Sequence, residues 1–573
     1  MSSEGSSAAP GARPVIPGGR SVTGVSVERD VAVLMRDGTV LRADIYRPEG
    51  ASAPLPVLLM RVPYGKRIAQ SFGYRPPQWY ARQGYIVAIQ DVRGRFGSGG
   101  VFRPFEDEVT DGVDTLDWAA GLPGSTGRVA MYGFSYAGYT QLAAAAAGHP
   151  ALACIAPAFA SHEIRDAWIY EGGALNLAFV VSWTIRMLAL GDAVRAGHDE
   201  HARGLAAALA DIEGQYRYRP LRDLAALREI GRTPYFFDWL EHEGTGEFWA
   251  GLDGLVDLDR IQVPCLHVGG WFDIFSRSTV SAYRRLASAP HAAEQRIVMG
   301  AWVHVPWDEG AAGLPPATES VAVDEVQLSW FDRHLKGSPA GPEAPVRLYR
   351  MGMGTWESLP AWPEVTEEVL WLASGGAAMS RRGDGVLTRG AAYGPPDHLV
   401  SDPHTPVLSQ GGNSCCIGGL APMGQTDQAK TEMRNDVLVY TSAPLAEPLG
   451  ILGTPVLELF VSSSSPSDDW VARLTDVDDQ GRSVNVSQGI QRVWNQGSEQ
   501  VRALRLELRP TSWMFASGHR IRLQITGADY PAHDVNAHTD RPTGTVGEAG
   551  MRVSMPAVLH QGRWPSRLVL PHG

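Results

Sequence analysis

Short apolar runs alternate with helix-like segments over residues 21–160 of the chain. The apolar runs lie at 56–60, 85–90 and 129–132, and the helix-like segments lie at 107–120 and 141–147. Strands that alternate with helices form a parallel sheet with helices on both faces, and such strands are apolar throughout. The pattern therefore predicts an α/β domain, which starts with a hairpin around an Asp37-Gly38 turn.

The pattern changes twice farther along the chain. Residues 161–254 lose the strand signal and carry helical patterns, which indicates a helical cap inserted into the α/β domain. Strand-like runs return in residues 255–345, which complete that domain. In residues 346–573, short alternating strands and turns dominate and predict a β-sandwich, most simply a jelly roll. Residues 1–20, rich in Ser, Ala, Pro and Gly, are expected to form a disordered tail.

A serine lies between the third apolar run and the helix that follows it. The sequence there is Gly133-Phe134-Ser135-Tyr136-Ala137-Gly138. A serine on a sharp strand-to-helix turn is the nucleophile elbow of an α/β-hydrolase, and glycines beside it let the strand and the helix cross closely. Ala137 stands where a glycine is more common, and it is small enough to keep the turn. The alternative is an ordinary strand–turn–helix with an incidental serine.

Two further residues complete the pattern of a Ser-His-Asp triad. In α/β-hydrolases the acid follows the serine along the chain, and the histidine comes last. Asp273 follows a strand predicted at 263–268, and His304 follows a strand predicted at 296–299. Both therefore fall on loops at the carboxyl ends of strands, where an open α/β sheet places its site. We expect His304 to act as the base for Ser135 and Asp273 to orient His304.

Two donors could stabilise an oxyanion. The backbone N–H of Tyr136, directly after the serine, is one of them. The second should come from the loop after the strand at 56–60, which contains Tyr64. The phenol of Tyr64 can hydrogen-bond an oxyanion, and a packed loop tyrosine is the alternative.

Composition and charge indicate which partners, cofactors and cellular compartment to expect. The 573 residues carry a net charge of −12, and no basic run interleaves with aromatic residues, so we expect no nucleic-acid partner. Four cysteines are too few for a disulfide framework, and the adjacent Cys415 and Cys416 are not expected to bridge. Cys154 and Cys265 lie in apolar stretches and are expected to be buried thiols, which suits a reducing cytoplasm. The chain shows no signal-peptide core and no run that approaches a membrane span, so we expect it in the cytoplasm. We expect no metal and no other cofactor.

Five motifs form a specific set over the α/β region. They are Pro63-Tyr64-Gly65-Lys66, Asp91-Val92-Arg93-Gly94-Arg95-Phe96-Gly97-Ser98-Gly99, Gly133-Phe134-Ser135-Tyr136-Ala137-Gly138, Gly269-Gly270-Trp271-Phe272-Asp273 and Gly300-Ala301-Trp302-Val303-His304. Together they resemble the cocaine esterase family (CocE/NonD hydrolases), within the wider group of X-Pro dipeptidyl peptidases of the S15 type. The resemblance implies an α/β-hydrolase domain, a helical cap and a jelly roll, with Tyr64 as the side-chain oxyanion donor.

The resemblance also bears on the substrate pocket. It implies that the cap residues Trp168 and Trp183 line an acyl pocket, and we expect Phe275 to bind substrate beside them; helix core is the alternative for the tryptophans. Amino-acid ester hydrolases of the family place acidic residues after the catalytic Asp to hold the substrate ammonium. Here an apolar run follows Asp273.

We predict a serine esterase that acts on small carboxylic esters through an acyl-enzyme. The cap acids Glu163, Asp166 and Glu171 could still supply a carboxylate, so an α-amino acid ester hydrolase stays open. An amidase or X-Pro dipeptidyl peptidase shares the chemistry and differs in the pocket. An acyltransferase is a further alternative, and the complete triad disfavours a carbohydrate-binding protein with an inactive hydrolase domain. The expected partner is a small-molecule ester, without a membrane, and we leave a homodimer open.

Overall fold

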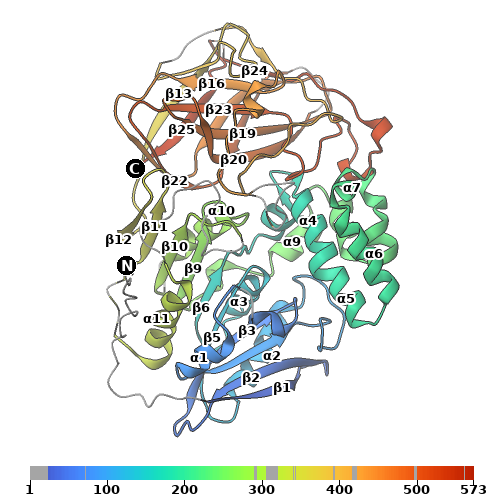
Figure 1. The fold of residues 1–573 in the computed structure, drawn as a ribbon, viewed down its shortest axis with the longest axis vertical. Coiled ribbons are helices and arrows are strands. Elements are labelled where there is room, and N and C mark those ends of the chain that lie inside the picture. The colour runs from blue at the N-terminus through green and yellow to red at the C-terminus, as the bar shows by residue number, and fades with distance from the viewer. Residues whose placement is uncertain are drawn as a thin grey trace, which may run out of the picture.

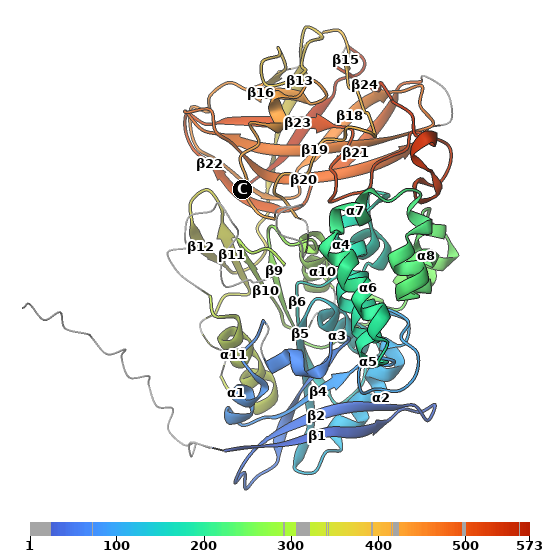
Figure 2. The same ribbon diagram turned by 45° about the vertical axis from the view of Figure 1, so that its right-hand side comes forward.

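The structure is a computed structural model that describes residues 24–573 except 71–72, 290–292, 305–320, 340, 342, 391–393, 414, 416–422, 496–499 and 561. The tail predicted at residues 1–20 lies outside the described residues. Figure 1 shows an α/β domain at one end of the long axis and a β domain at the other. The helices of the cap lie beside both domains, as the turned view in Figure 2 also shows.

A ten-stranded sheet forms the α/β domain. Its strands, in spatial order, are β1 (Val25–Leu34), β2 (Val40–Pro48), β4 (Ile86–Asp91), β3 (Leu55–Val62), β5 (Ser125–Phe134), β6 (Leu152–Ala158), β9 (Cys265–Gly270), β10 (Gln295–Gly300), β11 (Val346–Arg350) and β12 (Thr355–Leu359). The strands from β4 to β11 run parallel, whereas β1, β2 and β12 pair antiparallel at the two edges. The predicted parallel sheet is therefore confirmed.

Helices cover both faces of this sheet because its strands are apolar on both sides. They are α1 (Pro77–Arg82), α2 (Glu108–Ala120), α3 (Tyr136–Ala146), α10 (Ser276–Ala287) and α11 (Val323–Lys336). In β3, Val57 and Leu59 join the core that contains residues of α2 and α3. The alternate side chains, Leu58 and Met60, join the core that contains residues of α1 and α11. The two-residue period of a strand thus divides one apolar run between two cores.

The first sheet continues past residue 345, where we placed the end of the α/β domain. Strand β11 pairs in parallel with β10, and β12 pairs with β11. Residues 346–359 are thus the edge of the first sheet rather than the start of the β domain. Short alternating strands have the same sequence pattern in both settings, so the pattern alone could not separate them.

The segment between β6 and β9 is helical, as predicted. It contains the short strands β7 (Tyr170–Glu171) and β8 (Ala174–Leu175) and the helices α4 (Leu177–Trp183), α5 (Leu190–Arg195), α6 (Asp199–Ala210), α7 (Ile212–Arg217), α8 (Pro234–Glu241) and α9 (Glu247–Asp253). A wider helical turn at Thr184–Ala189 joins α4 and α5 into one helix, Leu177–Arg195. By length and composition this helix could cross a membrane, contrary to our expectation that no run approaches that length. However, 67% of its apolar window is buried inside the protein, as in a helix of a protein core.

The C-terminal domain consists almost entirely of strands, as predicted. They are β13 (Thr366–Ala373), β14 (Val386–Thr388), β15 (Asp397–His398), β16 (Leu438–Ser442), β17 (Leu449–Gly453), β18 (Val456–Ser462), β19 (Ser467–Val477), β20 (Ser483–Trp494), β21 (Arg502–Glu507), β22 (Thr511–Phe515), β23 (Arg520–Thr526), β24 (Ala557–Leu559) and β25 (Arg567–His572). They pair antiparallel, except β14 with β16. Their inward side chains form a core that continues into the α/β domain, where it includes Trp271, Ile297 and Met299.

The cysteines differ from our expectation at one position. Cys154 and Cys265 are buried free thiols, as expected. Cys415 is disulfide-bonded, which corrects the view that it does not bridge; its neighbour Cys416 lies outside the described residues. The steric argument against a bond between adjacent cysteines therefore does not decide the state of Cys415. The cysteines no longer support a reducing compartment.

Candidate active site

Ser135 occupies the turn between strand β5 and helix α3. Its backbone is left-handed, with φ 59° and ψ −128°, a conformation that non-glycine residues adopt only under local constraint. Gly133 also has a positive φ of 134°, and a Cβ there would lie 2.7 Å from the Cβ of Ala137. A Cβ on Gly138 would lie 2.5 Å from the Cβ of Ala160. Small residues are thus required on both sides of the serine, as the motif predicts.

The structure brings the three predicted triad residues together. The Nε2 atom of His304 lies 3.1 Å from the Oγ atom of Ser135, and Nδ1 of His304 lies 2.7 Å from Oδ1 of Asp273. Asp273 follows β9 and His304 follows β10, so both reach the site from the carboxyl ends of neighbouring parallel strands. All three are buried, with exposed fractions of 5% for Ser135, 3% for His304 and 0% for Asp273. This arrangement can transfer a proton from the serine to the imidazole.

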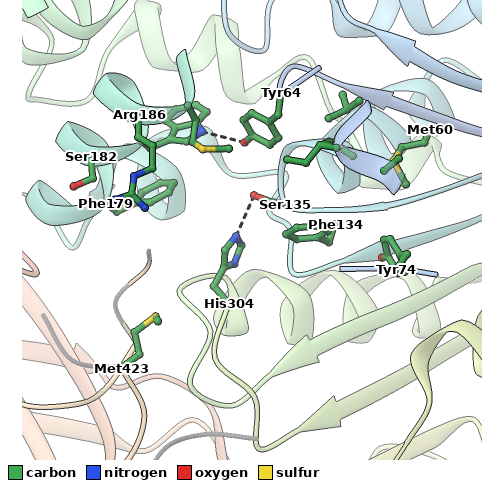
Figure 3. A pocket seen from close by; sticks show the side chains of 16 residues that line it. Met60, Tyr64, Tyr74, Phe134, Ser135, Phe179, Ser182, Arg186, His304 and Met423 are labelled. Carbon is green, nitrogen blue, oxygen red and sulfur yellow. Dashed lines mark hydrogen bonds between the residues drawn. The ribbon is translucent and has the colours of Figure 1, made fainter. Parts of the chain in front are cut away.

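Tyr64 lies beside Ser135 with its phenol held from the cap. The indole Nε1–H of Trp183 donates a hydrogen bond of 3.0 Å to the Tyr64 hydroxyl. Figure 3 shows Tyr64 beside Ser135. Because the phenol oxygen accepts from Trp183, its own proton remains available to another acceptor. Burial raises the pKa of Tyr64 to about 12, although hydrogen bonding to Trp183 and Ser135 lowers it. The phenol is therefore protonated at neutral pH and can act as a donor.

Tyr136 contributes through its backbone. It is the first residue of α3, and the first N–H groups of a helix have no acceptor within the helix. Its side chain points into the core, where its hydroxyl donates to Glu108 at 3.0 Å and accepts from the N–H of Phe105 at 2.7 Å. The backbone N–H of Tyr136 and the phenol of Tyr64 are thus the two donors that the sequence suggests for an oxyanion.

Arg95 is a site residue that sequence reasoning missed, although it lies in one of the five motifs. Its buried guanidinium donates to the carbonyl of Pro63 at 2.8 Å, directly before Tyr64. It also donates to the carbonyls of Met187 and Leu188, at 2.9 and 3.2 Å, on the cap helix. Arg95 therefore ties the Tyr64 loop to the cap. The five donors of an arginine suit such a role, but its sequence position did not reveal the acceptors.

A cavity of about 330 Å³ opens beside Ser135 and His304 (Figure 3). Most of its wall is apolar, from Met60, Val62, Ile68, Ala69, Phe134, Ala137, Phe179, Met187 and Met423; Tyr64, Tyr74, Ser182, Trp183 and Arg186 complete it together with the two catalytic candidates. The cap thus forms one wall, and Met423 of the β domain reaches the same space. A cavity of this kind suits a small, largely apolar substrate.

The predicted pocket residues divide into two groups. Trp183 lines the cavity, but Trp168 and Phe275 do not. Trp168 has no exposed surface and packs behind Trp183, with ring centroids 5.6 Å apart and 4.4 Å from Phe275. Phe275 in turn packs against the ring of His304 at 5.4 Å. Both therefore support the site from behind, because an aromatic side chain on a buried helical segment can face the core as well as a pocket.

The β domain holds the loop that carries Asp273. Asn413 donates hydrogen bonds to the carbonyls of Trp271 and Asp273, at 2.7 and 2.9 Å. The buried guanidinium of Arg509 donates to the carbonyl of Ile274, the next residue along the loop. No side chain of the β domain belongs to the predicted triad, yet two of its residues fix the backbone on both sides of Asp273.

Arg509 belongs to a buried ionic group between the cap and the β domain. We call Glu171 of the cap, together with Arg509, Asp529 and His533 of the β domain, the junction. Glu171 pairs with Arg509, and His533 lies 3.3 Å from both Glu171 and Asp529. Burial alone would lower the pKa of His533, but these two carboxylates raise it to about 9. Burial would raise the pKa of Glu171, but Arg509 and His533 hold it well below its usual range.

We expect the junction to lose stabilising energy at alkaline pH. The pKa of His533 rises from 6.5 to about 9 on folding, so its contribution is complete below pH 6.5 and is lost as the pH rises through about 9. The free energy of unfolding should fall by an amount on the order of 3 kcal/mol, since one pKa unit corresponds to about 1.4 kcal/mol. Denaturant unfolding at pH 6.5 and 9.5 measures the free energy of unfolding of the wild type and of His533→Gln. The two free energies should differ strongly at the lower pH and only slightly at the higher pH. The exposed His404→Gln is the matched control, and a difference that is the same at both pH values would contradict the assignment.

In the part of the chain that the structure describes, no group of three or more His, Cys, Asp or Glu side chains could hold a metal ion.

Comparisons with known proteins show the family to which this chain belongs. Residues 37–306 match the X-Pro dipeptidyl-peptidase (S15 family) model, and residues 340–569 match the model for the C-terminal non-catalytic domain of X-Pro dipeptidyl-peptidase. The chain is 32% identical to cocaine esterase of Rhodococcus sp. (strain MB1 Bresler), over 95% of this chain and 98% of that protein.

Solved structures are similar over nearly the whole chain. An aminopeptidase from a marine sediment archaeon, Thaumarchaeota archaeon, has a TM-score of 0.80 at 25% identity, covering 98% of this chain and 99% of its own. An α-amino acid ester hydrolase has a TM-score of 0.77 at 24% identity, covering 98% of both chains. The second of these shows a shared fold, which includes an α/β-hydrolase domain.

Proposed function

Because this chain belongs to the cocaine esterase family of serine hydrolases, we propose that it cleaves small carboxylic esters through an acyl-enzyme on Ser135. The observation that carries the proposal is the unbroken series of hydrogen-bond distances from Ser135 through His304 to Asp273. The largely apolar cavity beside Ser135 supports it, because such a cavity can hold an acyl group.

The mechanism follows from the positions of these groups. Ser135 Oγ attacks the ester carbonyl carbon while His304 Nε2 takes the hydroxyl proton. Asp273 accepts from Nδ1–H, which fixes the tautomer and stabilises the imidazolium. His304 then returns the proton to the departing alkoxide, which leaves the acyl group on Ser135. A water molecule, deprotonated by His304, attacks the acyl-enzyme, and the acid product leaves with Ser135 regenerated.

The negative charge that develops on the ester carbonyl oxygen needs hydrogen-bond donors close to Ser135. We assign this role to the Tyr64 phenol and the Tyr136 backbone N–H, because both are adjacent to Ser135 and Tyr64 is held by Trp183. Donors that are already positioned stabilise a developing oxyanion without reorganising during the reaction.

The carboxylates of the cap argue against a substrate ammonium. Glu163 accepts a hydrogen bond from Ser278, and Asp166 pairs with Arg165. Glu171 belongs to the junction. None of the three lines the cavity, and its described lining residues include no carboxylate, so an ammonium there would be desolvated without a partner among them. The similarity to an aminopeptidase structure keeps an amidase as the second candidate, because ester and amide cleavage use the same groups.

We expect methyl phenylacetate to be cleaved with a kcat/KM at least about 10-fold above that of phenylglycine methyl ester, at a pH where its amine is protonated. The two substrates differ only in the α-ammonium, so the ratio isolates its desolvation. An X-Pro anilide in the same assay measures amide cleavage, and Ser135→Ala gives the background rate. Faster cleavage of phenylglycine methyl ester, or of the anilide, would replace the proposal by an amino-acid ester hydrolase or an amidase.

A further inference from the structure

Arg186 is an unusual member of the cavity wall. Apart from the imidazole of His304, it is the one ionisable nitrogen group among the described residues that line the cavity. It forms no hydrogen bond or ion pair with another residue in the part of the chain that the structure describes. Its side chain is exposed, so it stands where the cavity meets solvent. A cation in a largely apolar wall is available to a ligand.

The cap helix directs Arg186 toward the catalytic residues. Phe179, Ser182, Trp183, Arg186 and Met187 all line the cavity and follow one another at spacings of three, four, seven and eight residues from the first. Such spacings place side chains on one helix face. Figure 3 shows Arg186 beside Phe179, across the cavity from Ser135 and His304. The cavity therefore connects Ser135 with Arg186.

Among the described residues that line the cavity, none is a carboxylate that could pair with Arg186. The cap acids Glu163, Asp166 and Glu171 have partners elsewhere. By contrast Arg195, on the same helix, lies 4.0 Å from the carboxylate of Asp192. An apolar wall weakens the screening of a charge by water, so an anion would be attracted more strongly here than at an open surface.

We propose that Arg186 selects esters that carry a carboxylate on their acyl or alcohol part. The planar guanidinium presents parallel N–H donors that match the two oxygens of a carboxylate. The ester group would lie at Ser135 while the carboxylate lies at the solvent-facing end of the cavity, where it keeps part of its hydration. This inference rests on the proposed ester hydrolysis, and it names the substrate class.

Matched substrates test the inference on both sides of the ester bond. Monomethyl adipate and its terminal amide, methyl adipamate, have the same shape and differ in an acyl-side charge. 4-Acetoxybenzoate and 4-acetoxybenzamide differ in the same way on the alcohol side. We expect kcat/KM to favour the carboxylate over the amide by about 10- to 100-fold in at least one pair, the range for a hydrogen bond to a charged group. The substrate pair in which kcat/KM favours the carboxylate identifies the side of the ester bond on which the substrate carries its charge.

Variants connect the preference to one side chain. Arg186→Gln should bring the carboxylate-to-amide ratio close to one, and Arg186→Lys should retain part of it, because a lysine keeps the charge without the fork. Arg195→Gln removes the same charge from the same helix away from the cavity and should leave the ratio unchanged. High salt should reduce the ratio in the wild type, because ions screen an exposed charge.

A binding measurement keeps the result independent of turnover. Monomethyl adipate and 4-acetoxybenzoate should each be titrated into Ser135→Ala by calorimetry; at least one should bind about 10-fold or more tighter than it binds to Ser135→Ala with Arg186→Gln. Equal affinity of both ligands for the two proteins, or wild-type ratios at or below one in both substrate pairs, would overturn the role of Arg186. Absence of ester cleavage with the neutral amides and the carboxylates alike would overturn the proposed function, while the binding difference would still report on Arg186.

Discussion

Replacing Ser135 with alanine should lower kcat on the order of 10⁶-fold, as expected for loss of the nucleophile from a triad. The reason is geometric: among the described residues of the cavity wall, Ser135 alone has a hydroxyl within hydrogen-bond distance of His304. The double variant with His304→Ala should be about as inactive as Ser135→Ala, because the two residues act as one unit. Initial rates with methyl phenylacetate, compared at equal folded protein, measure both effects.

A fluorophosphonate probe identifies the nucleophile directly. It should label the wild type at Ser135 and fail to label Ser135→Ala, with the site read by peptide mass spectrometry. Ser182 lines the same cavity from the cap, so Ser182→Ala is a control that should still be labelled. Labelling of Ser182, with Ser135 left free, would move the chemistry from the elbow to the cap.

Replacing Tyr64 with phenylalanine should lower kcat by roughly 10²- to 10³-fold, or about 2.7–4 kcal/mol, with little change in KM. The phenol is protonated at neutral pH, and the Trp183 indole fixes its oxygen beside Ser135. The lost hydrogen bond forms mainly as the oxyanion develops, so the transition state is affected more than the bound ester. Steady-state kinetics with a neutral ester separate the two parameters.

Tyr139→Phe is the matched control for Tyr64→Phe. It also removes a buried phenol close to the elbow, but Tyr139 lies on helix α3 and does not line the cavity. Its kcat should stay near that of the wild type. A Tyr64→Phe enzyme within a few-fold of the wild type would mean that Tyr64 only packs, and that the second oxyanion donor has to be found on another residue.

The sequence predicted the features that depend on local order along the chain. Ser135 can be located because glycines flank it and a strand and a helix enclose it. Asp273 and His304 can be located because the carboxyl ends of parallel strands meet at one edge of the sheet. In each case the backbone topology decides where the side chain goes, and apolar runs report that topology directly.

Other features depend on contacts between distant segments, which no local pattern reports. Trp168 and Trp183 are both aromatic residues of the cap, yet one is buried behind the site and the other lines the cavity. The sequence around Arg95 suggests an exposed side chain. However, its guanidinium donates hydrogen bonds to carbonyls that are 32, 92 and 93 residues away along the chain. The edge strands β11 and β12 have the pattern of the β domain and pair with the α/β sheet. Tertiary packing decides all of these.

The helix face that contributes to the cavity wall spans nine residues, Phe179 to Met187, in a chain of 573. On that face Trp183 donates a hydrogen bond to the oxyanion candidate Tyr64. The side chains of Phe179, Ser182, Arg186 and Met187 belong to the cap and not to the sheet that positions Ser135. Substitutions at these four positions can therefore change the substrate specificity while the catalytic residues stay the same. These four positions also form a small set of sites for a directed-evolution library that leaves the catalytic residues unchanged.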